Sequence, residues 1–361
     1  MRLPMLRSDG RPKTNLTYSK VRIMKNLVTA LIFTFATTVW AGDFEDGFAA
    51  SEAGDYKTAF SFYKKAAEQG ELAAQFNVGL YYDVGKGVAQ DDAEAVRWYK
   101  LAAAQGYSSA QYNLGAIYAN RKGVLQDDAE AVRWYKLAAT QGYSNAQLNL
   151  GFMFANGKGV AQDDAEAVRW YKLAAAQGYS SAQYNLGAIY ANRKGVIRDD
   201  AEAVRWYTLA ATQGYSNAQL NLGFMYANGK GVAQDYAEAV RWYELAAAQG
   251  NSIAQHNLGA MYANGKGVLQ DYAEAVRWYK LAAVRGNADA QFNLSQNYAT
   301  GKGVLQDDLQ AHMWMNLAAV SGDKGAQKAR DVIAEQMTIQ QIAKAQAMAK
   351  KCLVSKYKDC D

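Results

Sequence analysis

The segment GYSSAQYNLGAIYANRKGVLQDDAEAVRWYKLAATQ, residues 106–141, decides the fold, because close copies of it follow one another along the chain. Glycine recurs every 36 residues from Gly70 to Gly322, and tryptophan recurs with the same period from Trp98 to Trp314. Self-similarity at a fixed period of this length is the signature of a repeat protein, in which each repeat is one small structural unit.

The first half of the repeat predicts a helix. Ser108 to Gln111 has the S-x-x-Q form of a capping box, which predicts that the helix begins there. Leu114 and Tyr118 continue an apolar stripe at four-residue spacing. Gly115 lies inside this helix, where glycine costs about 1 kcal/mol relative to alanine. We expect the cost to be offset by close approach of the partner helix. Asn120 and the Lys-Gly-Val that follows end the helix.

The second half predicts another helix. Asp127 to Glu130 forms a second capping box, with acidic residues at the positive end of the helix. Trp134, Tyr135 and Ala138 follow at the spacing of a buried stripe, and Gly142 closes the helix. The tryptophans are therefore expected between helices rather than in a ladder that stacks on a ligand. No segment of the repeat reads as a strand.

A two-helix unit cannot bury its apolar face alone, so neighbouring units must stack. The predicted fold is all-α, a right-handed α/α superhelical solenoid of antiparallel helix pairs. Residues 42–69 are expected to form a degenerate, tetratricopeptide-like N-terminal cap, because Phe62 stands where later units carry tryptophan. Residues 70–321 are expected to form seven 36-residue repeats, and residues 322–361 a helical C-terminal cap.

Residues 1–41 read as a leader. Met24-Lys25-Asn26 precedes the apolar run from Leu27 to Val39, and Val39-Trp40-Ala41 resembles a signal-peptidase site with cleavage after Ala41. A membrane anchor is the alternative, but a bilayer core requires ~20 apolar residues. Met24 is a second possible start. The prediction is a bacterial protein exported to the periplasm or the exterior, without a stable membrane span after cleavage.

Charge and cysteine use narrow the function classes. Seven of the 39 basic and one of the 34 acidic residues lie in residues 1–41, so the rest carries 32 and 33, a net charge of −1. Such a chain is a poor candidate for nucleic-acid binding. Cys352 and Cys360 are expected to form a disulfide, with two free thiols as the alternative. His256 and His312 lie in different repeats and are expected at the surface, so no metal site, cofactor or catalytic pair is predicted.

Three motifs carry a resemblance to a known family. Ala-Gln-x-Asn-Leu-Gly-x-x-Tyr, Gly-x-Gly-Val-x-Gln-Asp and Ala-x-x-Trp-Tyr-x-x-Ala-Ala resemble the Sel-1-like repeats, relatives of tetratricopeptide repeats, over roughly residues 70–330. The resemblance implies an adaptor in protein complexes, and exported bacterial members often contact host or envelope components. Some cysteine-rich members are linked to penicillin binding or weak β-lactamase activity. The repeats here contain no cysteine, so that activity is not carried over.

The candidate binding residues lie where the repeats differ or where an asparagine recurs. Similarity to tetratricopeptide repeats implies that these first-helix positions face the concave groove, where the amides would hold the backbone of an extended peptide. The alternative is that the aromatic and apolar positions pack between neighbouring repeats. The candidates are Tyr112, Asn113, Leu148, Asn149, Phe152, Tyr184, Asn185, Leu220, Asn221, Phe224, His256 and Asn257.

The leading hypothesis is an exported, non-enzymatic scaffold that binds a protein or peptide. A cell-wall glycan binder is an alternative, because aromatic groove positions would also suit sugars. An enzyme with weak activity on β-lactams is another. The chain has three Ser-x-x-Lys sequences but neither of the partner motifs, Ser-Asp-Asn and Lys-Thr-Gly, that such an enzyme needs.

Overall fold

The structure is a computed structural model that describes residues 42–120, 125–192, 197–320 and 322–360. These residues form helices and connecting turns, without a strand among them, as predicted. The expected signal peptide falls in residues 1–41 and lies outside the described residues. The chain divides into two compact units, residues 1–173 and residues 174–361, and each is considered by itself.

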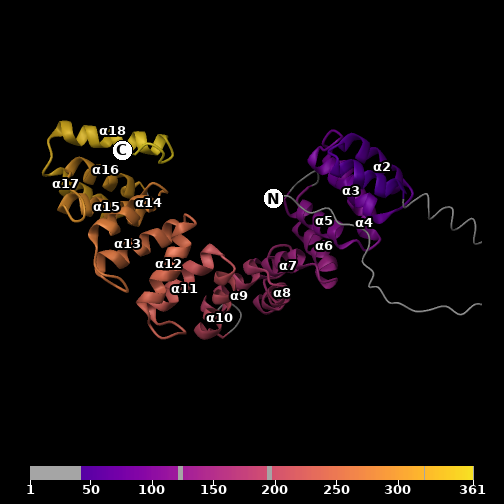
Figure 1. Cartoon of the computed structure of the whole chain (residues 1–361), viewed down its shortest axis with the longest axis horizontal. Coiled ribbons are helices and arrows are strands. Elements are labelled where there is room, and N and C mark those ends of the chain that lie inside the picture. Colours follow the sequence, from indigo (N-terminus) through magenta and orange to yellow (C-terminus); the bar gives the residue numbers. More distant parts are fainter. Residues whose placement is uncertain (1–41, 121–124, 193–196, 321, 361) are drawn as a thin grey trace, which may run out of the picture. The chain divides into compact units, whose positions relative to one another are not determined.

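Each repeat contributes a first and a second helix (Figure 1). The first helices are α3 (Leu72–Val84), α5 (Ser108–Asn120), α7 (Ser144–Asn156), α9 (Ser180–Asn192), α11 (Ser216–Asn228), α13 (Ser252–Asn264) and α15 (Ala288–Thr300). The second helices are α4 (Asp92–Ala104), α6 (Asp128–Thr140), α8 (Asp164–Ala176), α10 (Asp200–Thr212), α12 (Tyr236–Ala248), α14 (Tyr272–Ala283) and α16 (Asp308–Ala319). A helix over residues 42–52 and α2 (Tyr56–Glu68) precede them, and α17 (Lys324–Ala334) and α18 (Ile339–Val354) follow.

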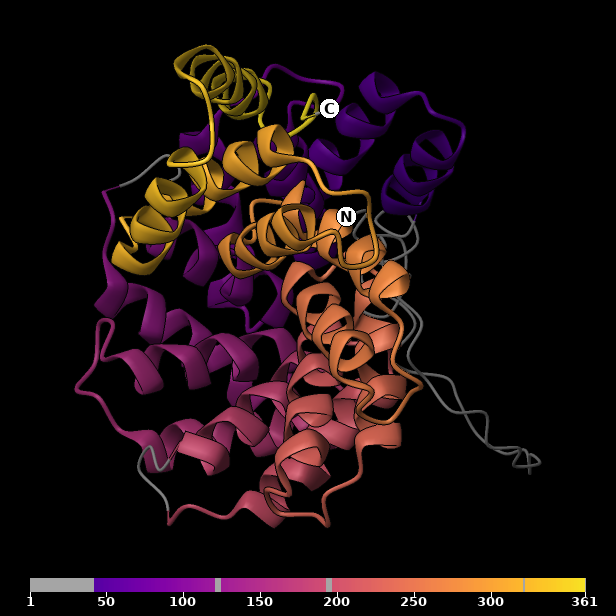
Figure 2. The ribbon, with the colours of Figure 1, turned by 90° about the vertical axis from the view of Figure 1, so that its left-hand side faces the viewer.

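Within each unit, helices next to each other in the sequence pack together, which gives the predicted stack of antiparallel pairs. In unit 1 the packing runs from α2 to α7, and in unit 2 from α9 to α17. The last helix, α18, packs on α16 (Figures 1 and 2). Cys352 on α18 is bonded to Cys360, so the predicted disulfide is confirmed. None of the described helices is long and apolar enough to cross a membrane.

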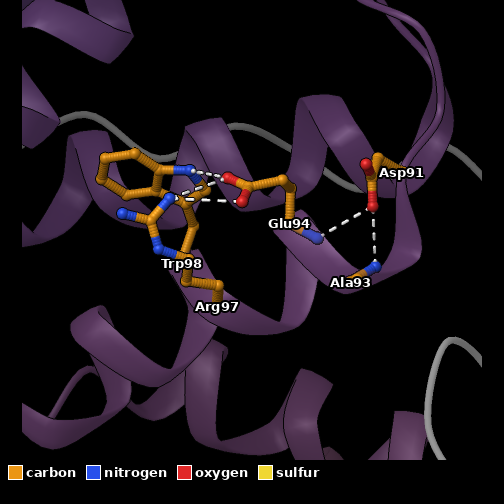
Figure 3. A network of polar contacts seen from close by, with 5 residues as sticks. All are labelled: Asp91, Ala93, Glu94, Arg97 and Trp98. Carbon is orange, nitrogen blue, oxygen red and sulfur yellow. Dashed lines mark hydrogen bonds and ion pairs between the residues drawn. The ribbon is translucent and has the colours of Figure 1, made fainter.

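The second helices begin as the sequence predicts. At α4, the Asp91 carboxylate accepts hydrogen bonds from the backbone N–H groups of Ala93 and Glu94, at 3.0 Å each (Figure 3). The Glu94 carboxylate then accepts from the Trp98 indole and from Arg97, rather than returning to the helix start. Only the aspartate half of the predicted capping box therefore forms, and the glutamate holds the side chains of the next turn.

The first helices begin at the predicted residues for a different reason. Ser144 lies inside α7, and its N-cap is Tyr143, which makes no side-chain capping bond. Gln111, the expected partner of Ser108, instead donates to the carbonyl of Ala103 on α4 at 3.1 Å. It also accepts from Gln141 at 2.7 Å. The predicted Ser-x-x-Gln capping box is wrong, because the buried glutamine ties one helix to its neighbours.

Most repeat tryptophans and the helix glycines lie in the core. Trp98, Trp134, Trp170, Trp242 and Trp314 are only 3% to 8% exposed, which confirms the prediction for these five, whereas Trp206 and Trp278 are half-buried. A Cβ on Gly115 would lie 2.5 Å from the Tyr135 ring on α6, so the expected close approach is that of a tyrosine ring. The loop glycine Gly159 has φ +66°, and a Cβ there would lie 2.1 Å from the backbone of Asp128. These contacts set the spacing within and between repeats.

Candidate binding face of the first helices

The predicted site residues lie on the first helices α5, α7, α9, α11 and α13, and all keep some exposure. Phe152 and Phe224 are the most open, each 45% exposed, whereas the others are half-buried. We call these positions the first-helix face. Its residues up to Phe152 belong to unit 1 and those from Tyr184 onward to unit 2.

The aromatic residues of this face contact the next repeat. The centre of the Tyr112 ring lies 5.9 Å from that of Tyr135 and 5.2 Å from that of Tyr143, which precedes α7. In unit 2, the Tyr184 ring lies 5.1 Å from that of Tyr215 in the same way. The sequence left open whether this position faces a groove or packs between neighbouring repeats, and the structure shows part of each. The ring packs between repeats and still presents one side to solvent.

The asparagines interact with buried tyrosines. Asn149 interacts with the hydroxyl of Tyr135, and Asn221 with that of Tyr207. Burial raises the pKa of Tyr135 to about 12, and the interaction with Asn149 opposes this rise. A primary amide offers two donors and an acceptor with two lone pairs. The half-buried asparagines retain hydrogen-bonding groups for a ligand.

Two equivalent pockets lie on this face, one in each unit. The pocket in unit 1 has a volume of about 210 Å³, and the pocket in unit 2 has a volume of about 190 Å³. The residues that line the second pocket are the equivalents, two repeats later in the sequence, of those that line the first. Both combine the first-helix face with the end of the preceding repeat. The lining of the first includes Asn120, Asp128, Tyr135, Asn149, Phe152 and Lys158, and that of the second includes Asn192, Asp200, Tyr207, Asn221, Phe224 and Lys230.

Each pocket places a lysine beside an exposed ring. The ammonium of Lys158 lies 5.3 Å from the centre of the Phe152 ring, and that of Lys230 lies 5.0 Å from the centre of the Phe224 ring. A cation over an aromatic face is attracted by the ring quadrupole. Sequence reasoning missed these lysines, although the recurrent Asn-Gly-Lys-Gly loop carries them, because it assigned that loop only to turning the chain.

The prediction that both histidines lie at the surface is wrong. His312 is 1% exposed and lies on α16, with its Nδ1 3.0 Å from the amide nitrogen of Asn316. His256 is half-buried, with its Nδ1 3.2 Å from the Asn257 oxygen and its Nε2 3.0 Å from the Asn293 nitrogen. Burial lowers the pKa of both imidazoles. His256 therefore links Asn257 and Asn293, two of the asparagines that recur every 36 residues on the first helices.

The chemistry of the face is that of recognition: amides, tyrosine hydroxyls, exposed phenyl rings and lysines. Among the described residues, no group of three histidine, cysteine, aspartate or glutamate side chains is placed to hold a metal ion. The histidines lie on different helices, and both ring nitrogens of His256 face asparagine amides. The arrangement is suited to holding a polar chain with apolar side groups.

Comparison with known proteins identifies the repeat. The Sel1 repeat is matched eight times in succession, at residues 44–71, 72–107, 108–143, 144–179, 180–215, 216–251, 252–287 and 288–323. The first match covers the segment that the sequence suggested as a degenerate cap.

Two solved structures share this architecture. A Sel1 repeat protein from Oxalobacter formigenes is 32% identical, with a TM-score of 0.68 over 89% of this chain and 98% of that one. A protective antigen of uropathogenic Escherichia coli with the same repeat fold is 28% identical, with a TM-score of 0.55 over 91% and 94% of the two chains.

A local similarity extends to two rodent proteins. The DAP3-binding cell death enhancer 1 of Rattus norvegicus is 49% identical over 43 residues, and that of Mus musculus is 46% identical over 43 residues. The match spans 12% of this chain and only 8% of either relative. It therefore shows a shared repeat and carries no conclusion about the function of the whole protein.

Proposed function

This chain belongs to the Sel1 repeat family, whose members generally serve as protein-interaction scaffolds, and from that premise we propose that it is an exported, non-enzymatic scaffold. Its first-helix face holds a protein or peptide partner in an extended form. The observation that carries the proposal is the pair of equivalent pockets at Phe152 and Phe224. Each offers an apolar ring beside an asparagine amide, which together suit a peptide group and its side chain.

Export is supported by two features. Residues 24–41 have the charge, apolar run and small-residue end of a signal peptide. Cys352 and Cys360 form a disulfide, a bond that persists in oxidising compartments. Intact-mass analysis of protein from the native host is expected to give a chain that starts at Gly42. A full-length chain recovered from the cytoplasm would contradict export.

Site-specific photo-crosslinking tests the binding face. A photoreactive benzophenone residue would replace Phe152 or Phe224, which are exposed enough to accept it, and the purified chain would be irradiated in envelope extract. The matched control carries the same residue at Arg169, which is exposed on the second helix α8. We expect one protein band at both phenylalanine positions and none at Arg169. A band at Arg169 alone would refute the proposed face.

The exposed phenyl rings favour a glycan as the second candidate, because sugar rings also stack on aromatic side chains. Purified peptidoglycan provides the test. If the wild-type chain cosediments with peptidoglycan and the Phe152→Ala, Phe224→Ala double variant does not, the glycan reading replaces the peptide reading. Turnover of nitrocefin by the purified chain would overturn the non-enzymatic assignment in the same set of experiments.

A further inference from the structure

A cavity larger than the two pockets described above lies near the C-terminal end of unit 2. It measures about 590 Å³, within the range of roughly 300–1,000 Å³ that is usual for pockets that hold small ligands. It is the counterpart of the smaller unit 2 pocket, two repeats further along the chain. Asn264, Tyr279, Asn293 and Lys302 take the places of Asn192, Tyr207, Asn221 and Lys230.

The charged residues that line the two pockets differ. The smaller pocket is lined by Arg198, Asp200 and Lys230, and Asp200 pairs with Arg198 at 2.6 Å. In the larger cavity Tyr272 replaces the aspartate, and Lys302 is the one charged residue among the described residues that line it. The Lys302 ammonium lies 5.6 Å from the centre of the Tyr272 ring, and no ion pair engages it in the described part of the chain. The cavity therefore presents an unbalanced positive charge.

An amide lines the same cavity as this lysine. Gln296 occupies the position of Phe224, and its side chain is exposed at the cavity. Its NH₂ group can donate two hydrogen bonds, and the lysine ammonium three. An ammonium and an amide in the lining of one cavity provide donors for a carboxylate, and the charge-assisted hydrogen bonds from the ammonium are stronger than neutral ones.

An apolar part of the lining, the apolar wall, comes from α16 and the C-terminal cap. Ala329, Val332 and Ile333 of α17 line the cavity together with Met315 of α16, whereas the smaller pockets have no such wall. Val332 remains 57% exposed. This wall follows Asn293, the last of the asparagines that recur every 36 residues on the first helices, so a chain held along the first-helix face meets α17 there.

From this arrangement we propose that the cavity binds the C-terminal residue of the protein partner. Its α-carboxylate contacts Lys302 and Gln296, and its aliphatic side chain lies against Val332, Ile333 and Met315. The assignment rests on the proposed function, since it names the part of the partner that occupies one end of the face. A C-terminal residue fits because it combines one negative charge with one apolar side chain. It also has no following residues that would have to pass α17.

The test compares two fluorescein-labelled peptides of the sequence Gly-Ser-Ala-Asn-Ala-Leu, one with a free carboxylate and one with a C-terminal amide. Fluorescence anisotropy with the mature chain is expected to show about tenfold tighter binding of the acid, the size of one charge-assisted contact. Lys302→Met removes this preference, while Lys328→Met, exposed on α17 but outside the cavity lining, keeps it. Val332→Glu abolishes binding, while Val320→Glu, equally exposed but away from the cavity, does not.

Three outcomes would overturn the assignment: equal affinity for the acid and the amide, no binding of either at millimolar concentration, or displacement of the peptide by decanoate as readily as by acetyl-leucine. The last would show that the cavity accepts any aliphatic anion. If crosslinking of the partner still requires the first-helix face while the peptide acid binds no more tightly than the amide, only this inference fails. If that partner does not depend on the face, the proposed function fails instead.

Discussion

At the scale of single residues, the spacing of the helix pairs depends on a glycine that faces a tyrosine ring. A Cβ on Gly151 would lie 2.7 Å from the Tyr171 ring, and the other first helices repeat this contact up to Gly259 and Tyr279. The last repeat departs at both positions together: Ser295 replaces the glycine, and Met315 replaces the tyrosine. The Ser295 hydroxyl then donates to the carbonyl of Ala311 at 2.6 Å. The two positions therefore fit each other.

This pairing predicts a measurable coupling. Gly151→Ser is expected to lower the free energy of unfolding by about 1–3 kcal/mol, because the added atoms overlap the Tyr171 ring. Combining it with Tyr171→Met should recover at least about 1 kcal/mol relative to the sum of the single variants. Urea melts of the four proteins provide the measurement. Simple additivity would mean that the ring and the glycine do not constrain each other.

The buried tyrosines predict a loss of stability in alkali. Burial raises the pKa of Tyr207 and Tyr243 to about 12, above the value of about 10 expected in an unfolded chain. Because the folded-state pKa is the higher one, the neutral hydroxyl stabilises the fold fully below about pH 10. That contribution, on the order of 2–3 kcal/mol for each tyrosine, is lost between about pH 10 and pH 12.

Urea melts across this range test the prediction. Wild-type unfolding free energy should fall steeply above about pH 10, and Tyr243→Phe should show a smaller fall because one titrating group is gone. An identical slope for the two proteins would contradict the assigned role of the hydroxyl.

At the scale of helices, the sequence predicted the elements better than their causes. The first helices start at the predicted serines, but Gln147 reaches back to the carbonyl of Ala139 at 3.1 Å instead of closing a capping box. A short pattern fits both arrangements, since a side chain that can cap its own helix can also cap its neighbour. Only the packed position of the preceding helix decides between them.

Two substitutions distinguish these arrangements. Gln147→Ala should cost about 1 kcal/mol, because it removes the side-chain hydrogen bond to the Ala139 carbonyl, which still accepts from the backbone N–H of Gly142. Ser144→Ala should change stability by less than about 0.5 kcal/mol, because its hydroxyl does not cap α7. Chemical denaturation of both variants is the measurement. A larger effect at Ser144 would restore the capping interpretation.

The C-terminal helix depends on its disulfide. Cys352 is fully buried among side chains of α14, α15 and α16, so the bridge to Cys360 holds the chain end against this cluster. Replacing both cysteines by serine should cost up to about 2–3 kcal/mol, the value of closing a short loop. The loss should be confined to α18, so hydrogen exchange of its amides should accelerate while that of unit 1 stays unchanged. Equal acceleration throughout would contradict a local role.

At the scale of the whole molecule, the repeat period alone predicted an all-helical stack of pairs, since each pair has an apolar stripe that only a neighbour can cover. It also predicted the burial of five of the seven repeat tryptophans. The pockets were not predictable in this way. Phe152 and Lys158 are close in sequence, but Asn120 and Tyr135 belong to the preceding repeat, and only the packed structure brings all four to one pocket. The buried His312 was missed for the same reason.

The central claim is that the first-helix face holds the partner, and variants of the recurrent first-helix asparagines test it. Asn149→Ala and Asn185→Ala should each weaken binding of the photo-crosslinked partner by about 1–2 kcal/mol, the cost of leaving a peptide group of the partner unpaired. Tyr184→Ala should cost about 2 kcal/mol or more if the ring is a hot spot. Arg169→Glu, on the outer side of α8, should leave affinity unchanged.

A matched control separates binding from structure, since Asn149 also interacts with the Tyr135 hydroxyl. Tyr135→Phe removes that hydroxyl but leaves the amide in place, so this variant should bind the partner normally if the amide acts on the ligand. Circular dichroism would first establish that every variant is folded.

The most direct measurement is therefore the dissociation constant of the captured partner for these five variants, by isothermal titration calorimetry. The account predicts weaker binding for Asn149→Ala, Asn185→Ala and Tyr184→Ala, and wild-type binding for Tyr135→Phe and Arg169→Glu. Normal affinity of the three face variants, with binding abolished by Arg169→Glu, would contradict it.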